Sequence, residues 1–159
     1  MPAGWRLESL GLLLQMEATD PPAVPPGLDI VPLVTNAQRR DARVLTSLVY
    51  PHYFRSETMQ LGRYFGLYEH GTLAGMVGER MGCPGFREVS AVCTHPEWTG
   101  RGFARRLFAW LTGDLLASGQ VPFLHVSPQN RRAIDLYLQN GYRVRHQIPF
   151  HQLDRAAIR

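Results

Sequence analysis

The sequence predicts an α/β domain with a central, mixed but mostly antiparallel sheet flanked by helices, and two observations carry this prediction. Residues 63–81 alternate as an antiparallel hairpin does, with His70-Gly71 at the turn. From residue 87 to residue 153, strand-like and helix-like segments then follow one another in regular order. A meander followed by alternating strands and helices is typical of a mixed sheet covered by helices. The 159 residues suffice for one domain with its own core.

The first part of the chain is expected to hold a strand, a spacer, a short strand and two helices. Thr35 and Gln38 have the spacing of a capping box, which predicts the start of a helix that ends at Pro51. The segments, in chain order, are a strand over 5–17 with a glycine interruption, a proline-rich spacer over 21–27, a short strand within 28–33, the capped helix, and a short helix over 56–61. We divide the chain into this leading strand with its spacer, 1–27, and the domain proper, 28–159.

In the second part of the chain, apolar residues at helical spacing predict helices. The first helix carries Phe103, Leu107 and Leu111 on one face and ends at Ser118-Gly119. The remaining segments are strands over 87–94 and 122–126, a helix over 130–140 that stops at Gly141, and one or two closing strands over 142–153.

Composition narrows the classes of function. The net charge is +4, and all seventeen basic residues are arginine. Without lysine the chain has no Walker-type phosphate loop, so a P-loop NTPase is excluded. No basic stripe interleaved with aromatic residues is present, so nucleic-acid binding is not favoured. A modest positive charge suits a small polyanionic cofactor.

Location and redox state follow from what the sequence lacks. No segment is long and apolar enough to span a membrane, and the N-terminus does not have the pattern of a signal peptide. Cys83 and Cys93 have no metal-ligand spacing, and their strand-like surroundings predict small buried hydrophobic side chains. The histidines show no metal-ligand spacing either, so no metal is expected. We therefore expect a reduced, cytoplasmic protein.

Three small residues, Gly100, Gly102 and Ala104, lie between the strand over 87–94 and the following helix. A glycine-rich turn at a helix start directs unpaired backbone N–H groups at one spot, where the helix dipole also favours an anion. A dinucleotide site is not indicated, because Arg105 occupies the third glycine position and no acid follows at the right distance. Taken alone, the loop is equally compatible with a tight turn.

The segments VCTHPEWTGRGFA (92–104) and NRRAIDLYLQNGY (130–142) together resemble the GNAT superfamily of N-acetyltransferases, which use acetyl-coenzyme A. The loop matches the family signature at Gly102 and Ala104 and departs from it at Thr99, where arginine or glutamine is usual. The second motif is matched at Asn130, Ala133, Ile134, Leu136, Tyr137, Gly141 and Tyr142. The resemblance covers residues 28–153. Related bacterial members often carry residues before the first strand, so the chain is also compatible with a short form.

The resemblance implies a set of cofactor-binding residues. The backbone of Val92 and Thr94 would bond the pantetheine arm, Asn130 would hold that arm, and Tyr137 would face the thioester sulfur. The backbone N–H groups from Gly100 to Arg105 would hold the pyrophosphate. The full set is Val92, Cys93, Thr94, Thr99, Gly100, Arg101, Gly102, Phe103, Ala104, Arg105, Asn130 and Tyr137.

The expected activity is transfer of an acetyl group from acetyl-CoA to a primary amine by direct attack in a ternary complex. Such a reaction needs a proton for the departing thiolate and a base for the amine. Tyr137 is the candidate acid. Glu88 is the candidate base, because it matches the strand glutamate of histone-acetylating members. Glu88 is alternatively a solvated carboxylate or an ion-pair partner of Arg80 or Arg87.

Several alternatives stay open. Glu79 and His125 are lesser candidates for a base or for substrate binding, and a chain of water molecules would serve as well. The acceptor, a small molecule or a peptide, is expected in the region 54–68 and at a closing hairpin. A homodimer is left open. The alternative function is a non-catalytic domain of the same fold that binds acyl-CoA as a sensor or scaffold.

Overall fold

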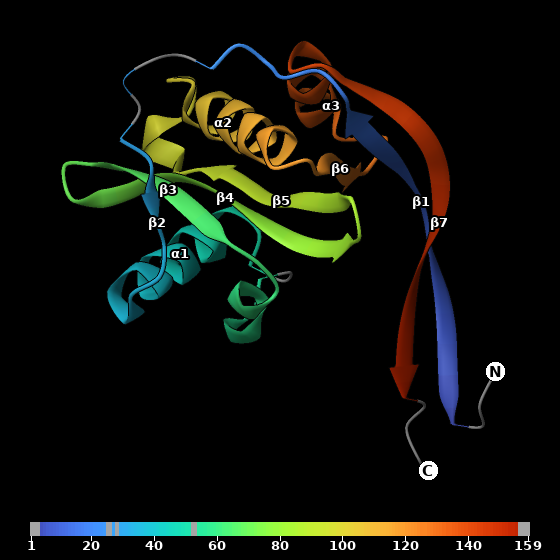
Figure 1. The fold of residues 1–159 in the computed structure, drawn as a ribbon. Helices are drawn as coiled ribbons and strands as arrows, with labels where there is room; N and C mark the ends of the chain where they lie inside the picture. Colours follow the sequence, from blue (N-terminus) through green and yellow to red (C-terminus); the bar gives the residue numbers. More distant parts are fainter. Residues whose placement is uncertain (1–3, 25–26, 28, 52–53, 156–159) are drawn as a thin grey trace.

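The structure, a computed structural model, describes residues 4–24, 27, 29–51 and 54–155. One sheet runs through the molecule in the order β2-β3-β4-β5-β6-β1-β7 (Figure 1). Its strands are β1 (Trp5–Ala18), β2 (Val31–Pro32), β3 (Tyr64–Glu69), β4 (Thr72–Cys83), β5 (Phe86–Thr94), β6 (Val121–Val126) and β7 (Tyr142–Arg155). β5 and β6 pair in parallel, whereas the other neighbouring pairs are antiparallel. The predicted mixed, mostly antiparallel sheet is confirmed.

Helices cover both faces of this sheet. The α-helices are α1 (Asn36–Val49), α2 (Phe103–Ala117) and α3 (Arg131–Gln139), and two short 3₁₀ helices are η1 (Ser56–Gln60) and η2 (Pro96–Trp98). α1 and α2 pack against β4 and β5 from opposite faces, and α3 packs against β7 (Figure 1). In the part of the chain that the structure describes, no helix is long and apolar enough to cross a membrane.

Two local signals in the sequence are confirmed. The Thr35 hydroxyl accepts from the Gln38 N–H at 3.2 Å, and the Gln38 side-chain oxygen accepts from the Thr35 N–H at 2.9 Å, so the capping box is formed. At the turn between β3 and β4, His70 and Gly71 have φ values of 48° and 80°. Positive φ at both central residues is the geometry of a tight hairpin turn.

The N-terminal strand β1 lies between β6 and β7 in the sheet. Residues 14–17 of β1 pair with β6 on one side, while the whole of β1 pairs with β7 on the other (Figure 1). The expected closing hairpin is therefore wrong: β7 is one continuous strand, and its partner comes from the opposite end of the chain. Residues 25, 26 and 28, within the predicted spacer and short strand, lie outside the described residues.

The core consists of two apolar clusters, one on each face of the sheet. The cluster under α2 contains Met16, Phe65, Leu107, Phe108, Leu111 and Leu124, among others. The cluster under α1 and η1 contains Leu33, Ala42, Leu45, Met59, Tyr64, Leu73, Met76 and Cys93. Burial of Cys93 is confirmed, but Cys83 is exposed because it ends β4 at a turn.

Candidate active site

The two parallel strands β5 and β6 are paired over only part of their length. Pairing runs from Phe86 to Glu88 on β5, and both strands continue beyond it, β5 as far as Thr94. Among the described residues, the edge of β5 beyond Glu88 that faces β6 has no strand partner. Its unpaired backbone groups are a template for hydrogen bonds to an extended ligand. The strands thus form a wedge that is closed at Glu88 and open toward the end of β5.

The orientation of the β5 backbone determines which groups face this wedge. The His95 N–H donates to the Ala74 carbonyl on the β4 side at 2.8 Å. Because backbone groups alternate along a regular strand, the Thr94 N–H points to the opposite side, into the wedge, whereas Val92 lies in a bulge and the direction of its N–H stays a prediction. Thr94, one of the two backbone positions that the resemblance implied for the pantetheine arm, therefore faces the wedge, and its role there stays a prediction.

A bulge bends β5 at this point. Two residues of β5, Ala91 and Val92, oppose a single residue of β4, because the register shifts between Ser90 and Cys93. Ala91 has φ of 52°, a left-handed conformation that costs about 1–3 kcal/mol in a non-glycine residue. Bulges are over-represented next to active sites. The sequence did not indicate this bulge, because alanine carries no signal for positive φ.

The glycine loop follows at the end of β5. Gly100 and Gly102 have φ values of 84° and 78°, and at both positions a Cβ atom would point into open space. Gly102 is the N-cap of α2 and provides no side-chain cap. The first helical bond is from the Arg106 N–H to the Gly102 carbonyl, so the three preceding N–H groups have no intrahelical partner. This helix start can therefore accept an anion.

The other predicted residues of the loop surround this helix start. Arg101 and Arg105 are exposed, and the Thr99 hydroxyl donates to the His95 carbonyl at 3.5 Å. Phe103 is buried in the core and lies under the Arg106 guanidinium, 4.7 Å from the ring centroid. Phe103 and Ala104 thus contribute backbone N–H groups, while Phe103 also anchors the helix.

Asn130 and Tyr137 lie at the two ends of α3. The Asn130 side-chain oxygen caps the helix by accepting from the Ala133 N–H at 3.2 Å, which leaves its NH₂ group free to donate. The Tyr137 ring packs on Phe108 of α2, with centroids 4.8 Å apart. Burial raises the pKa of Tyr137 to about 12, so the phenol keeps its proton at neutral pH.

Tyr50, which the sequence did not single out, belongs to the same region. Its hydroxyl is buried and has no nitrogen or oxygen partner among the described residues. Burial raises the pKa of Tyr50 strongly, and the neighbouring Cys93 thiol and Tyr137 phenol raise it further. A buried hydroxyl without a partner costs about 1–3 kcal/mol, which a polar atom of a ligand would remove. Tyr50 lies just before Pro51 and belongs to no motif, so only tertiary packing reveals it.

Glu88 marks the closed end of the wedge and is not a solvated carboxylate. Its side chain is 1% exposed, and Arg80 forms two hydrogen bonds with it, at 2.9 and 2.6 Å. Nδ1 of His125 lies 2.8 Å from the same carboxylate, and Nε2 of His125 lies 3.1 Å from Nε2 of Gln15. Burial acts to raise the pKa of Glu88, but the bonds from His125 and Arg80 outweigh it and lower the pKa. Glu88 therefore anchors two cationic or polar partners, and its role as a base stays a prediction.

Glu79, the lesser candidate, is engaged elsewhere. It is buried, and its carboxylate accepts from the Arg63 Nε–H at 2.8 Å. Arg63 also contacts Asp114 of α2 at 2.9 Å. Within the described ranges, no group of three or more His, Cys, Asp or Glu side chains is gathered as for a metal ion.

The Glu88 network gives a prediction about stability. Glu88→Gln keeps the side-chain shape but leaves Arg80 and His125 without a negative partner, which should lower the free energy of unfolding by about 3 kcal/mol at pH 7. Because folding lowers the pKa of Glu88, its stabilisation is complete above the unfolded pKa of about 4.3 and disappears as pH falls through the folded pKa. The difference between the two proteins should therefore shrink below about pH 4.

Urea unfolding at pH 7 and pH 3 measures this difference. The exposed Glu97 provides the control, and Glu97→Gln should change stability by less than about 0.5 kcal/mol. A Glu88→Gln protein as stable as the wild type at pH 7 would contradict the proposed anchoring.

Comparison with known proteins identifies the family. Residues 64–150 match the FR47-like protein family. A crystal structure of a GNAT-family protein from Novosphingobium aromaticivorans has a TM-score of 0.87 and 35% sequence identity, covering 98% of this chain and 70% of that one. The chain belongs to the GNAT superfamily. This confirms the resemblance found in the two sequence motifs.

More distant GNAT structures share the fold. A GCN5-related N-acetyltransferase from Sphaerobacter thermophilus has a TM-score of 0.68 at 19% identity, covering 98% of this chain and 55% of that one. The ribosomal-protein-S18-alanine N-acetyltransferase from Escherichia coli has a TM-score of 0.61 at 17% identity, covering 70% of this chain and 75% of that one. No curated protein is significantly similar in sequence. Membership of the GNAT superfamily supports acetyl transfer as the general chemistry of the chain.

Proposed function

We propose that this GNAT-superfamily chain transfers an acetyl group from acetyl-CoA to a primary amine by direct attack in a ternary complex. The observation that carries the proposal is the continuity of two backbone features. The unpaired edge of β5 runs directly into the glycine loop and the uncapped start of α2. A ligand in which an extended arm is joined to a pyrophosphate needs backbone hydrogen-bond donors arranged in this order.

Several groups along this path are available to hold acetyl-CoA. The N–H groups of Val92 and Thr94 would bond the pantetheine arm, and the free NH₂ group of Asn130 would hold it from the α3 side. The N–H groups from Gly100 to Arg105 would hold the pyrophosphate, with open space at both glycines for the phosphates to approach. The exposed guanidinium groups of Arg101 and Arg105 add positive charge at the same place.

The chemistry requires stabilisation of charge on oxygen and sulfur. When bound, acetyl-CoA supplies the activated acyl group; the new C–N bond forms as the C–S bond breaks. Tyr137, protonated at neutral pH, would donate its proton toward the departing sulfur. The buried Tyr50 hydroxyl, which lies beside the Cys93 thiol and has no nitrogen or oxygen partner among the described residues, would donate to the acyl oxygen, on which charge develops.

The proton released by the amine has two candidate routes. Glu88 would accept it directly, or water molecules in the wedge would carry it to solvent. The engaged, low-pKa carboxylate of Glu88 favours the second route, because a base works best when its pKa is near the operating pH. The pH profile of kcat in Glu88→Gln distinguishes the routes: loss of the acidic limb supports Glu88 as the base, and an unchanged profile supports water.

A non-catalytic acyl-CoA sensor is the second candidate, and the engagement of the Glu88 carboxylate by Arg80 and His125, which occupies the candidate base, favours it. Both candidates predict binding of acetyl-CoA, and they differ in turnover. We expect calorimetry to show binding and a screen of primary amines to release free CoA thiol with at least one of them. Binding without thiol release from any amine would support the sensor, and absence of binding would reject both.

A further inference from the structure

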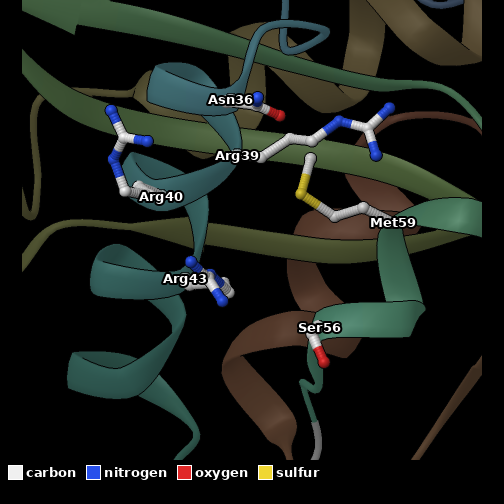
Figure 2. A pocket seen from close by; sticks show the side chains of 6 residues that line it. All are labelled: Asn36, Arg39, Arg40, Arg43, Ser56 and Met59. Atoms are coloured by element: carbon white, nitrogen blue, oxygen red, sulfur yellow. The ribbon is translucent and has the colours of Figure 1, made fainter.

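One face of α1 gathers positive charge that the proposed reaction does not use. Arg39, Arg40 and Arg43 follow Asn36 at spacings of three, four and seven residues, which places them on one side of the helix. They line a hollow of ≈ 280 Å³ between α1 and η1 (Figure 2). We call it the arginine hollow; its lining residues are Asn36, Arg39, Arg40, Arg43, Ser56 and Met59.

The arginines that line the hollow have no anionic partner among the residues that the structure describes. Among the described residues, no carboxylate lies within 4.0 Å of Arg39, Arg40 or Arg43. Arg39 Nε donates to the Val34 carbonyl at 3.3 Å, which fixes the side chain and leaves its terminal nitrogens free. Figure 2 shows Arg39 extending from α1 above Met59.

This arrangement of arginines does not stabilise α1. Like charges three or four residues apart on a helix repel one another by a few tenths of a kcal/mol per pair. The first turn of α1 contains no acidic residue, and cations in the N-terminal half oppose the helix dipole. A bound anion would relieve both costs. Planar guanidinium groups form bidentate hydrogen bonds with carboxylate and phosphate, and the Asn36 amide adds a neutral donor, whereas the Ser56 hydroxyl already donates to Glu57 at 2.6 Å.

The hollow is connected to the proposed reaction site through its floor. Met59 is buried in the same apolar cluster as Cys93, and Tyr50 packs against that cluster. Arg43 lies on α1, and Tyr50 is the residue at which this helix ends. The hollow and Tyr50 thus border the same apolar cluster on the α1 face of the sheet.

We propose that the arginine hollow binds an anionic group, a carboxylate or a phosphate, on the amine acceptor. The acceptor is then a small amine that also carries an acidic group. This inference rests on the proposed acetyl transfer, and it names the chemical class of the second substrate. The pyrophosphate site at α2 lies on the opposite face of the sheet and is separate from the hollow.

The test compares three linear amines of equal length, which end in a carboxylate, a phosphonate or a neutral amide. In the wild type, kcat/KM should be higher for at least one acidic amine than for the amide. In Arg39→Gln/Arg43→Gln this preference should fall by about 10- to 100-fold, since hydrogen bonds to charged groups are worth about 1.5–3 kcal/mol. The affinity for acetyl-CoA should not change. Arg6→Gln/Arg155→Gln, which removes two exposed charges at the far end of β1 and β7, should keep the preference.

A direct titration separates this proposal from the proposed function. Glutarate and inorganic phosphate, neither of which can be acetylated on nitrogen, are titrated into both proteins and followed by NMR or calorimetry. Weaker binding of the probes to Arg39→Gln/Arg43→Gln than to the wild type supports an anion site in the hollow, even if no amine is acetylated. The probe that binds more tightly shows whether the hollow prefers a carboxylate or a phosphate. Equal binding to the two proteins, or an acidic preference that survives the substitutions, overturns it.

Discussion

Gly102→Glu should abolish binding of acetyl-CoA, with an affinity at least about 100-fold lower than that of the wild type. Gly102 is the N-cap of α2, and a side chain there would project into open space at the start of the helix. A carboxylate at that place would itself accept from the free N–H groups and would repel a pyrophosphate. Two or more charge-assisted hydrogen bonds would then be lost, each worth about 1.5–3 kcal/mol.

The control separates this effect from backbone strain. Gly119, just beyond the other end of α2, has φ of 76° and equally open surroundings. Gly119→Glu therefore introduces the same side chain with the same left-handed strain of about 1–2 kcal/mol, far from the phosphate position. Calorimetry should show normal acetyl-CoA affinity for Gly119→Glu and none for Gly102→Glu. Equal affinity of the two variants would remove the glycine loop from the cofactor site.

Tyr137→Phe should lower kcat by about 100- to 10,000-fold, the usual contribution of a general acid. The substitution keeps the ring that packs on Phe108 and removes only the hydroxyl. Acetyl-CoA affinity should barely change, because a donor to sulfur matters mainly when charge develops in the transition state. Steady-state kinetics with an amine found in the screen, together with calorimetry, measures both quantities.

A matched substitution makes the result specific. Tyr142 lies near Tyr137, with ring centroids 6.2 Å apart, and its hydroxyl pairs with Thr112 in the core at 3.1 Å. Tyr142→Phe should lower stability by about 1 kcal/mol and leave kcat nearly unchanged. Full activity in Tyr137→Phe would exclude this residue as the acid. Loss of acetyl-CoA binding together with activity would instead assign Tyr137 a structural role.

The two motifs of the sequence led to the family because both depend on residues that are close in the chain. The glycines at 100 and 102 take up positive φ and open a helix, and a second helix follows at Arg131–Gln139 within the predicted range 130–140, as the local patterns predicted. The capping box at Thr35 and the turn at His70-Gly71 are confirmed for the same reason. Each of these features is decided by backbone conformation and hydrogen bonds within a few residues.

The sequence named electrostatic partners for Glu88 but could not choose among them. Arg80 and Arg87 were both candidates for an ion pair, and only the fold selects Arg80 of β4 and adds His125 of β6. Tyr50 acquires an unpartnered buried hydroxyl only when α1 packs onto β5. A pKa depends on desolvation and on charges from other elements, so no motif states it.

The sequence by itself therefore determined the order of the elements, the superfamily and the glycine loop that opens α2, all of which follow from local pattern. Only the tertiary structure decided that β1 enters between β6 and β7, that Cys83 is exposed and that β5 bulges at Ala91. It also brought η1 against α1 to form the arginine hollow. These features depend on pairing and packing between segments far apart in the chain, where the free energy of burial and of strand registration outweighs local preference.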